Sequence, residues 1–344
     1  MLSLNAQLLR QGSTSFETVL RLKRHGLLAA SKIQSLEPCA KYREDGMHLR
    51  STFLNGLVHV ASDYNNVITF RKINRIMTSK DPVLFKFSCS TIKLSHGICL
   101  PNNSFICSGG KPCFACLFNI LASVLGMPAF AVWSIENHSN VQGMTTPSSL
   151  GMIQADQPET LMDVSIGSNT NLFYGCTDTA RVVRWDSREN HVASTEKSHS
   201  GPIVSISLNP FNKNLFATGG VDKQIKIWDI RKLAKSGKSH AICEIDAHDK
   251  PIKKIAWSPF CENLIASSSE DASVRIFSSQ GERLLVHLGH RSPVETFSWC
   301  DWEKSPYTIA SADYDSQYGV STIQVWGFNE IIVESHLPSQ SLRL

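Results

Sequence analysis

Four residue types recur in fixed order along the second half of the chain: a histidine, a hydroxyl residue, an aspartate and a large aromatic residue. The histidine precedes the aspartate by 23 residues in two copies and by 25 in the third, and the hydroxyl residue lies four positions before each aspartate. The three sets are His199, Thr218, Asp222 and Trp228; His248, Ser267, Asp271 and Phe277; and His290, Ser311, Asp315 and Trp326. Such a repeat restricts the chain to architectures built from one unit many times.

The first copy contains a β-hairpin pattern between Leu215 and Asp229. Two apolar segments flank a turn with glycine and aspartate, and a Trp-Asp pair closes the second segment. The aromatic positions at Trp228, Phe277 and Trp326 are 49 residues apart, and Trp185 lies 43 residues before the first of them. Strand patterns with a period of about 40 to 50 residues are typical of propeller blades. The sequence therefore predicts an all-β propeller with four recognisable blades.

This part of the chain resembles WD40 repeats. In that family the histidine, the strand hydroxyl, the turn aspartate and the tryptophan indole of each blade are hydrogen-bonded to one another. Buried polar groups of this kind are tolerated when all of them are satisfied. The alternative, a histidine and carboxylate pair for acid-base catalysis, requires an accessible group. We therefore predict that the three sets are structural.

Residues 51–130 carry a weaker form of the same pattern. Leu57 to Phe70 combines an apolar strand, a turn with Asp63 and a second apolar strand. The segment before residue 131 leaves room for about three further blades, and about seven would close a ring. We expect divergent or incomplete blades in residues 51–130, clear blades in 131–333 and a tail in 334–344. A truncated or misjoined chain is the alternative explanation of the weak pattern.

Residues 1–50 are expected to form a short N-terminal helix or a leader. Leucines alternate there with Arg10, Arg21, Lys23 and Arg24, and Glu17 is the only acid before residue 37. A basic, amphipathic segment of this kind is typical either of a peripheral helix that packs against the propeller or of a mitochondrial transit peptide.

An uncharged stretch between Lys111 and Glu136 raises the question of a membrane helix. The pattern from Phe130 to Ile135 matches a propeller strand, which leaves residues 114–127. This is shorter than the roughly 20 residues that a helix needs to cross a bilayer. We therefore expect no membrane association.

Composition excludes several other classes of protein. The chain has ten cysteines without the spacing of a small disulfide framework, which indicates a reducing compartment. Cys113 and Cys116 form one CxxC pair, but no second pair follows, so we expect buried thiols and no metal. Ser108 to Lys111 is followed by proline and is therefore no phosphate loop. We predict no catalytic residues, no enzyme activity and no cofactor.

One WD40 subfamily is most similar over residues 131–333. The similar segments include Leu161-Met-Asp-Val-Ser, Trp185-Asp-Ser-Arg, Trp228-Asp-Ile-Arg, Phe297-Ser-Trp and Ile323-Gln-Val-Trp. They resemble the second half of the retinoblastoma-binding, Msi-type histone-binding proteins. The resemblance implies a nuclear scaffold that binds core histones as a subunit of chromatin-modifying or chromatin-assembly complexes.

The binding surface implied for this chain is the face of the propeller. The family's acidic, proline-containing loop has no counterpart after Phe277, so its side groove is not expected here. Residues 131–331 carry 18 Lys+Arg against 23 Asp+Glu, a balance of −5, which favours basic protein partners over nucleic acid. Glu270 and Tyr314, each next to a turn aspartate, are the candidate partner-binding residues. The alternative is a WD40 adaptor of another complex, such as ubiquitin ligase, trafficking or ribosome-assembly machinery, with a cytoplasmic location.

Overall fold

The computed structural model describes the backbone of the strands between residues 2 and 152 and the side chains of much of the rest of the chain. The side chains described are those of residues 161–165, 172–186, 197–233, 240–300, 307–318 and 321–328, with Glu159, Arg188 and Val192. The expected tail, residues 334–344, lies outside the described residues.

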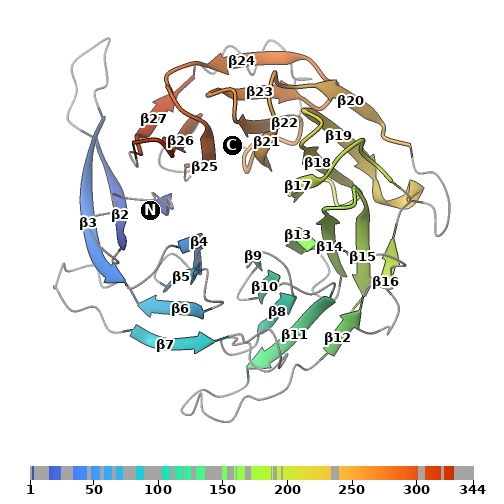
Figure 1. The fold of residues 1–344 in the computed structure, drawn as a ribbon, viewed down its shortest axis with the longest axis horizontal. Coiled ribbons are helices and arrows are strands. Elements are labelled where there is room, and N and C mark those ends of the chain that lie inside the picture. Colours follow the sequence, from blue (N-terminus) through green and yellow to red (C-terminus); the bar gives the residue numbers. More distant parts are fainter. Residues whose placement is uncertain are drawn as a thin grey trace.

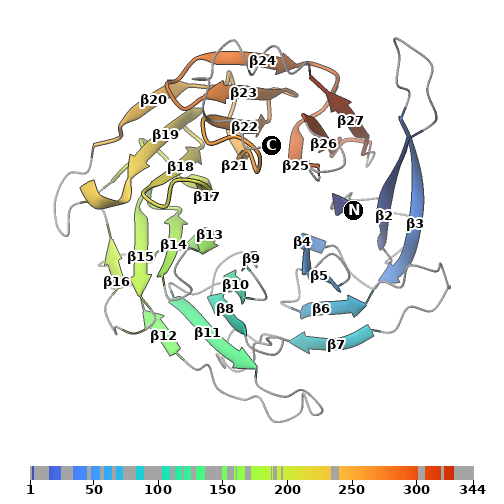
Figure 2. The same cartoon turned by 180° about the vertical axis from the view of Figure 1, so that it is seen from behind.

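The described strands form seven sheets that follow one another around a ring (Figures 1 and 2). The predicted all-β propeller is therefore confirmed. The three sheets of the first half contain β1 (Leu2–Ser3), β2 (Ser15–Arg24) and β3 (Gln34–Glu44); β4 (His48–Leu54), β5 (Val58–Asp63), β6 (Val67–Lys72) and β7 (Val83–Ser88); and β8 (Asn103–Ser108), β9 (Cys113–Leu117), β10 (Ile120–Val124), β11 (Ala129–Ile135) and β12 (Ser149–Met152).

The four sheets of the second half are antiparallel meanders, because each strand pairs with the next one in the chain. They contain β13 (Leu161–Ile166), β14 (Leu172–Thr177), β15 (Val182–Asp186) and β16 (Val192–Ser194); β17 (Ile203–Leu208), β18 (Leu215–Gly220), β19 (Gln224–Asp229) and β20 (Cys243–Asp246); β21 (Ile252–Trp257), β22 (Leu264–Ser269), β23 (Val274–Ser278) and β24 (Arg283–His287); and β25 (Val294–Trp299), β26 (Thr308–Asp313) and β27 (Ile323–Gly327). A short 3-10 helix, η2 (Ile230–Lys232), follows β19.

The helix expected near the N-terminus is wrong for the residues that the structure describes. Ser15–Arg24 and Gln34–Glu44 are the paired antiparallel strands β2 and β3. From Leu20 to Lys23 apolar and basic residues alternate with period two, which is the pattern of a strand with one apolar face. The many leucines favour an amphipathic helix, but the alternation of apolar and basic residues over this short segment predicts the strand correctly.

The hairpin predicted from Leu57 to Phe70 is present as β5 and β6, which pair antiparallel within a four-stranded sheet. The sheet that follows is irregular, since β8 and β10 pair in parallel. The uncharged stretch contributes strands β9 and β10 to that sheet. No helix among the described residues is long and apolar enough to span a bilayer.

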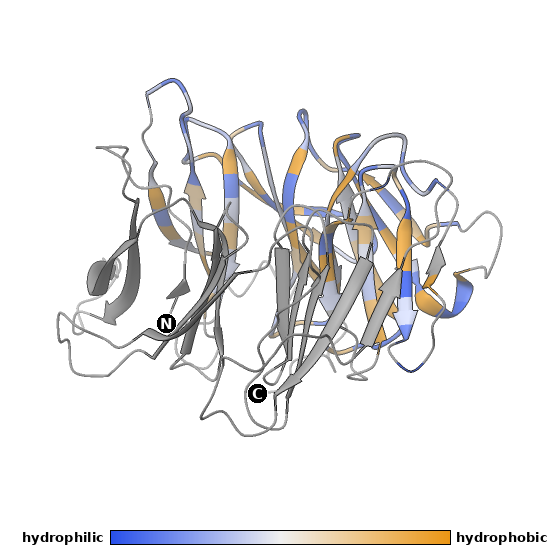
Figure 3. Cartoon of the chain, turned by 60° about the horizontal axis from the view of Figure 1, so that its bottom comes forward, coloured by the Kyte–Doolittle hydropathy of each residue, from blue (hydrophilic) through white to orange (hydrophobic). Residues whose placement is uncertain are grey.

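The core of the second half lies between neighbouring sheets. One cluster joins Ile225 and Ile227 of β19 to Ile252 and Ile255 of β21, and all four are at most 2% exposed. Gly219 of β18 allows this close approach, because a Cβ there would lie 2.7 Å from Cγ2 of Ile255. Apolar residues line the strands, and hydrophilic residues gather in the loops at the upper edge of Figure 3. Packing between blades therefore holds the loops on a rigid frame.

Candidate functional site

The first predicted set forms one continuous hydrogen-bond chain. Trp228 Nε1 donates to Thr218 Oγ1 over 2.8 Å, Thr218 Oγ1 lies 2.8 Å from His199 Nε2, and His199 Nδ1 lies 2.9 Å from Asp222 Oδ2. The order of donors fixes the tautomer. The ionised carboxylate of Asp222 can only accept, so Nδ1 of a neutral His199 carries the proton, and its Nε2 accepts from the Thr218 hydroxyl.

The carboxylate that ends this chain is held ionised. Burial alone would raise the pKa of Asp222, but the hydrogen bond from His199 and those from the backbone N–H groups of Ser200 and Gln224 outweigh it, and the pKa lies below its usual value. The His199 side chain is 0% exposed. A substrate therefore has no access to this pair, which favours the structural role that the sequence predicted.

The second set has the same chain, except at the aromatic position. His248 Nδ1 lies 2.9 Å from Asp271 Oδ2, and its Nε2 lies 2.7 Å from Ser267 Oγ. Phe277 has no donor and packs edge-to-face against His248. Arg275 adds a bond to Asp271 over 3.1 Å. In this blade the Arg275 guanidinium therefore adds a hydrogen bond to the Asp271 carboxylate, while the Phe277 ring contributes packing alone.

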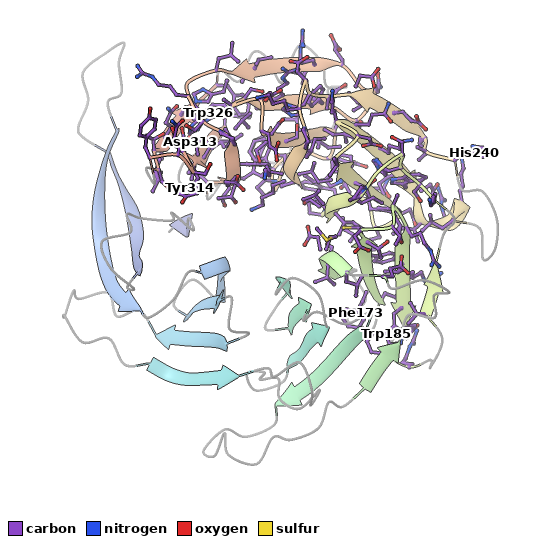
Figure 4. The ribbon with its side chains drawn as sticks, viewed as in Figure 1. Phe173, Trp185, His240, Asp313, Tyr314 and Trp326 are labelled. Atoms are coloured by element: carbon purple, nitrogen blue, oxygen red, sulfur yellow. The ribbon has the colours of Figure 1, made fainter. Side chains whose placement is uncertain are left out.

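The third set contains the principal correction to the sequence analysis. Ser311 Oγ lies 2.7 Å from His290 Nε2 and accepts from Trp326 Nε1 over 3.0 Å. The carboxylate beside His290 Nδ1 is that of Asp313, at 3.0 Å, and not that of the predicted Asp315. His290 Nδ1 is buried beside this carboxylate without a well-aligned hydrogen bond among the described residues. Figure 4 shows Asp313 and Trp326 on the same blade.

Turn length explains the exchange of aspartates. Residues 314–322 join β26 to β27, whereas residues 221–223 and 270–273 make the corresponding turns of the two preceding sheets. The longer turn carries Asp315 away from the histidine, where it accepts from the backbone N–H groups of Gln317 and Tyr318. A sequence signal was available, because Asp313 follows His290 by the same 23 residues as in the other two copies.

The blade of β13 to β16 has a different polar cluster, which the sequence analysis missed. Glu159, 4% exposed, accepts a hydrogen bond from the Thr179 hydroxyl and a 3.1 Å bond from Arg181. The Thr179 hydroxyl also lies 3.0 Å from that of Thr177. The histidine pattern does not predict this cluster, because in this blade a glutamate outside the strands takes the place of the histidine. The aromatic pair of this blade, Phe173 and Trp185, is labelled in Figure 4.

The aspartate of each Trp-Asp pair caps the chain after the third strand. Asp229 Oδ1 accepts from the backbone N–H and Nε of Arg231, and its Oδ2 accepts from the guanidinium over 2.7 Å. Asp186 and Arg188 repeat these three bonds. The hydrogen bonds from the Arg188 guanidinium lower the pKa of Asp186 to about 2. The dipeptide is thus a turn-forming element, which accounts for its repetition without a catalytic role.

The two candidate partner-binding residues lie on one rim of the ring. This rim carries the turns that follow the second strand of each sheet, and it is here named the turn rim. Glu270 and Tyr314 occupy equivalent positions in neighbouring blades with Val221 in a third. Their backbone N–H groups donate to the carbonyl oxygens of prolines that begin each blade, over distances of 2.9 to 3.1 Å. The backbone is therefore fixed, while the side chains are at least partly exposed. Lys253 lies 2.9 Å from Glu270 and 3.4 Å from Glu295 of the next blade.

Comparison with known proteins identifies the repeat. The family model described as "WD domain, G-beta repeat" matches residues 190–229 and 239–278. The chain carries WD40 repeats. Each WD40 match takes the outer strand of one sheet and three strands of the next, so that one repeat spans two neighbouring blades. Sequence repeats that are offset from the blades tie neighbouring sheets together covalently.

Two plant proteins are similar to parts of the chain. WD-40 repeat-containing protein MSI4 of Arabidopsis thaliana is 31% identical over 270 residues, which cover 67% of this chain and 50% of that protein. WD-40 repeat-containing protein MSI3 of the same plant is 40% identical over 178 residues, which cover 48% of this chain and 40% of that protein. The chain thus spans half or less of the length of each relative. It is a WD40 protein-interaction scaffold related to MSI-type proteins.

Proposed function

We propose that this WD40 scaffold is a nuclear, non-catalytic histone-binding subunit of chromatin-modifying or chromatin-assembly complexes. The observation that carries the proposal is the similarity to MSI4, at 31% identity over two thirds of this chain. It supports the resemblance of the sequence to the Msi-type histone-binding subfamily, whose members act as such subunits.

The turn rim is the surface on which we place the bound histone segment. Its carboxylates at Glu270 and Glu295 have side chains that are 37% and 44% exposed, and both contact Lys253. A basic segment that approaches from solvent meets these carboxylates on a fixed backbone, which lowers the entropic cost of binding. No loop comparable to the family's acidic insertion follows Phe277, since residues 279–282 form a short turn between β23 and β24.

Copurification with core histones tests the proposal. Tagged protein from nuclear extract is expected to retain core histones, and the double change Glu270→Ala and Tyr314→Ala is expected to weaken that retention at least severalfold. Val221→Ala is the matched control, because it alters the equivalent rim position in another blade without removing charge or an aromatic ring. Unchanged retention in the double variant would show that the bound surface lies elsewhere.

The same experiment separates the second candidate, an adaptor of a non-chromatin complex. Mass spectrometry of the retained proteins would then show ligase, trafficking or ribosome-assembly components and no histones. Imaging of the tagged protein provides an independent readout, since the proposal requires a nuclear location. Cytoplasmic protein without associated histones would contradict it.

A further inference from the structure

A cleft of about 390 Å³ opens beside the turn between β26 and β27. Its described lining residues come from the connection before β25, the end of β26, the turn that follows it, and β27. Its side chains include Arg291, Asp313, Asp315, Tyr318 and Gln324. The volume falls within the range of about 300 to 1,000 Å³ that is usual for ligand pockets.

The turn beside the cleft is longer than its counterparts. The corresponding turns of the two preceding blades close tightly, with Lys223 at φ 71° and Ala272 at φ 63°. In those blades the turn aspartate folds back onto the histidine. Here Asp313 takes that position from the end of β26, and the turn aspartate Asp315 is not needed beside the histidine. The cleft thus lies at the blade in which the strand, and not the turn, supplies the carboxylate.

Two carboxylates give the cleft its chemical character. Asp313 is 4% exposed, and its Oδ1 accepts two short bonds from Thr322. Burial alone would raise the pKa of Asp313, but the bonds from Thr322 and the contact with His290 hold it below its usual value. Asp315 Oδ1 caps the turn, whereas its Oδ2 has a single weak contact, 3.4 Å from Ser292 Oγ. Asp315 Oδ2 thus retains acceptor capacity.

The remaining charges of the cleft leave it anionic. Arg291 is exposed and contributes one positive charge against the two carboxylates. His290 lies behind Asp313, and burial lowers its pKa, so the imidazole is neutral at pH 7. The lining side chains therefore sum to −1 at neutral pH, from −2 for the two aspartates and +1 for the arginine.

An aromatic ring lies at the edge of the cleft. Tyr318 lines the cleft and is 72% exposed, the second highest exposure among the large hydrophobic residues that the structure describes. An exposed tyrosine beside carboxylates provides a face for a cation, with an attraction of about 0.5 to 1 kcal/mol at exposed sites. Gln324 adds an amide that also bonds to the Gly289 carbonyl oxygen and to His287.

We propose that this cleft binds the side chain of one arginine or lysine of a partner peptide, with Asp315 as the ion-pair partner and Tyr318 as the face over which the cation lies. Asp313 supplies the negative floor of the cleft. This inference rests on the proposed function, because it names the subsite that selects a basic residue in the bound segment. It adds a second contact point on the turn rim, next to Tyr314.

The test uses the full chain and two fluorescein-labelled peptides, one in which four arginines alternate with glycine and one in which glutamines replace the arginines. Fluorescence anisotropy at low salt is expected to show saturable binding of the arginine peptide alone. Asp315→Asn preserves the acceptor that caps the turn and is expected to raise Kd roughly fivefold, since an exposed ion pair contributes up to about 1 kcal/mol. Tyr318→Ala is expected to raise Kd roughly two- to fivefold, whereas Tyr318→Phe keeps the ring and the affinity.

Asp246→Asn is the matched control, because it removes the same charge from an exposed residue outside the cleft. Equal affinity of wild-type protein and Asp315→Asn would overturn the inference, as would absence of arginine-peptide binding or equal binding of the glutamine peptide. Histone copurification separates the two proposals. Histones retained equally by Asp315→Asn would leave the proposed function standing without the cleft. Arginine-peptide binding that depends on Asp315, without histone retention, would leave the cleft standing without the histone function.

Discussion

Replacing Asp222 by alanine tests whether the polar chain holds a blade together. The change leaves the Nδ1 proton of His199 without its acceptor, in a side chain that is 0% exposed. A buried donor that loses its partner costs about 1 to 3 kcal/mol. The N–H of Ser200 is exposed and can turn to water, while that of Gln224, whose bond is 3.3 Å long, adds a few tenths. We therefore expect a loss of about 2 kcal/mol.

Urea unfolding monitored by tryptophan fluorescence measures this loss, since Trp228 reports on the same blade. Asp246→Ala serves as the control, because it removes an exposed aspartate from a neighbouring strand and should change the unfolding free energy by less than about 0.5 kcal/mol. An Asp222→Ala midpoint equal to that of the wild type would refute the assignment of a stabilising chain. Asp222→Asn keeps one acceptor oxygen and should fall between the two.

The pH dependence gives the same prediction a second readout. The pKa of Asp222 is lower in the folded protein than its usual value of about 3.9. Its contribution to stability is therefore present above about pH 4 and is lost as the pH falls through the folded-state pKa. The difference between wild type and Asp222→Asn should thus be constant from pH 5 to 7 and should shrink below about pH 4. A difference that grows in acid would contradict the sign of the shift.

Four further substitutions test the separate elements of the blades. Asp313→Ala should lower the free energy of unfolding in urea by about 1 to 3 kcal/mol, because it removes the buried carboxylate beside His290. Asp315→Ala should lower it by less than about 1 kcal/mol, because Asp315 is a partly exposed turn residue. A larger loss for Asp315→Ala than for Asp313→Ala would show that Asp315, as predicted from the sequence, is the structural carboxylate. Trp228→Phe should lower the free energy of unfolding by about 1 kcal/mol, because Thr218 loses the indole donor but keeps its hydrogen bond to His199. A loss above about 4 kcal/mol would show that the packing of the indole ring contributes more than its hydrogen bond. Gly219→Ala should reduce the free energy of unfolding by about 1 to 3 kcal/mol and lower the melting temperature accordingly, because the added Cβ would clash with Ile255 of the next blade. An unchanged melting temperature would show that the two blades can move apart to accommodate the methyl group.

The regular part of the fold was predictable because its constraints are local and repeated. The spacing of His199 and Asp222 matches that of His248 and Asp271, and in both cases the structure brings the pair together. Two blades with short turns, residues 221–223 and 270–273, predict the position of the carboxylate correctly. The third blade keeps this spacing of 23 residues between His290 and Asp313, but it departs from the spacing of four residues between hydroxyl and aspartate, because a longer connection, residues 314–322, follows β26.

The parts that could not be predicted depend on contacts that do not follow the repeated pattern of histidine, hydroxyl residue and aspartate. Glu159 joins its blade through Thr179 and Arg181, 20 and 22 residues later, whereas a histidine and an aspartate make the corresponding contact in the next two blades. Asp163 is another example, since it accepts from Ser205 Oγ of the next innermost strand over 3.0 Å, and Ser205 in turn accepts from the N–H of Ile255 over 3.3 Å. Such contacts between blades depend on how the sheets are placed around the ring, and the repeat period of the sequence does not predict that placement.

The exchange of Asp315 for Asp313 connects stability to function. A blade of this type requires one ionised carboxylate beside its buried histidine, and the structure shows that this carboxylate can come from the turn, as at Asp222, or from the end of the strand, as at Asp313. When the strand supplies it, the turn no longer has to fold back and is free to lengthen. The longer turn places Tyr318 and a second carboxylate beside a cleft. The two-residue shift in one polar contact thus accompanies the change from a tight structural turn to the longer turn beside which we propose that a basic side chain binds.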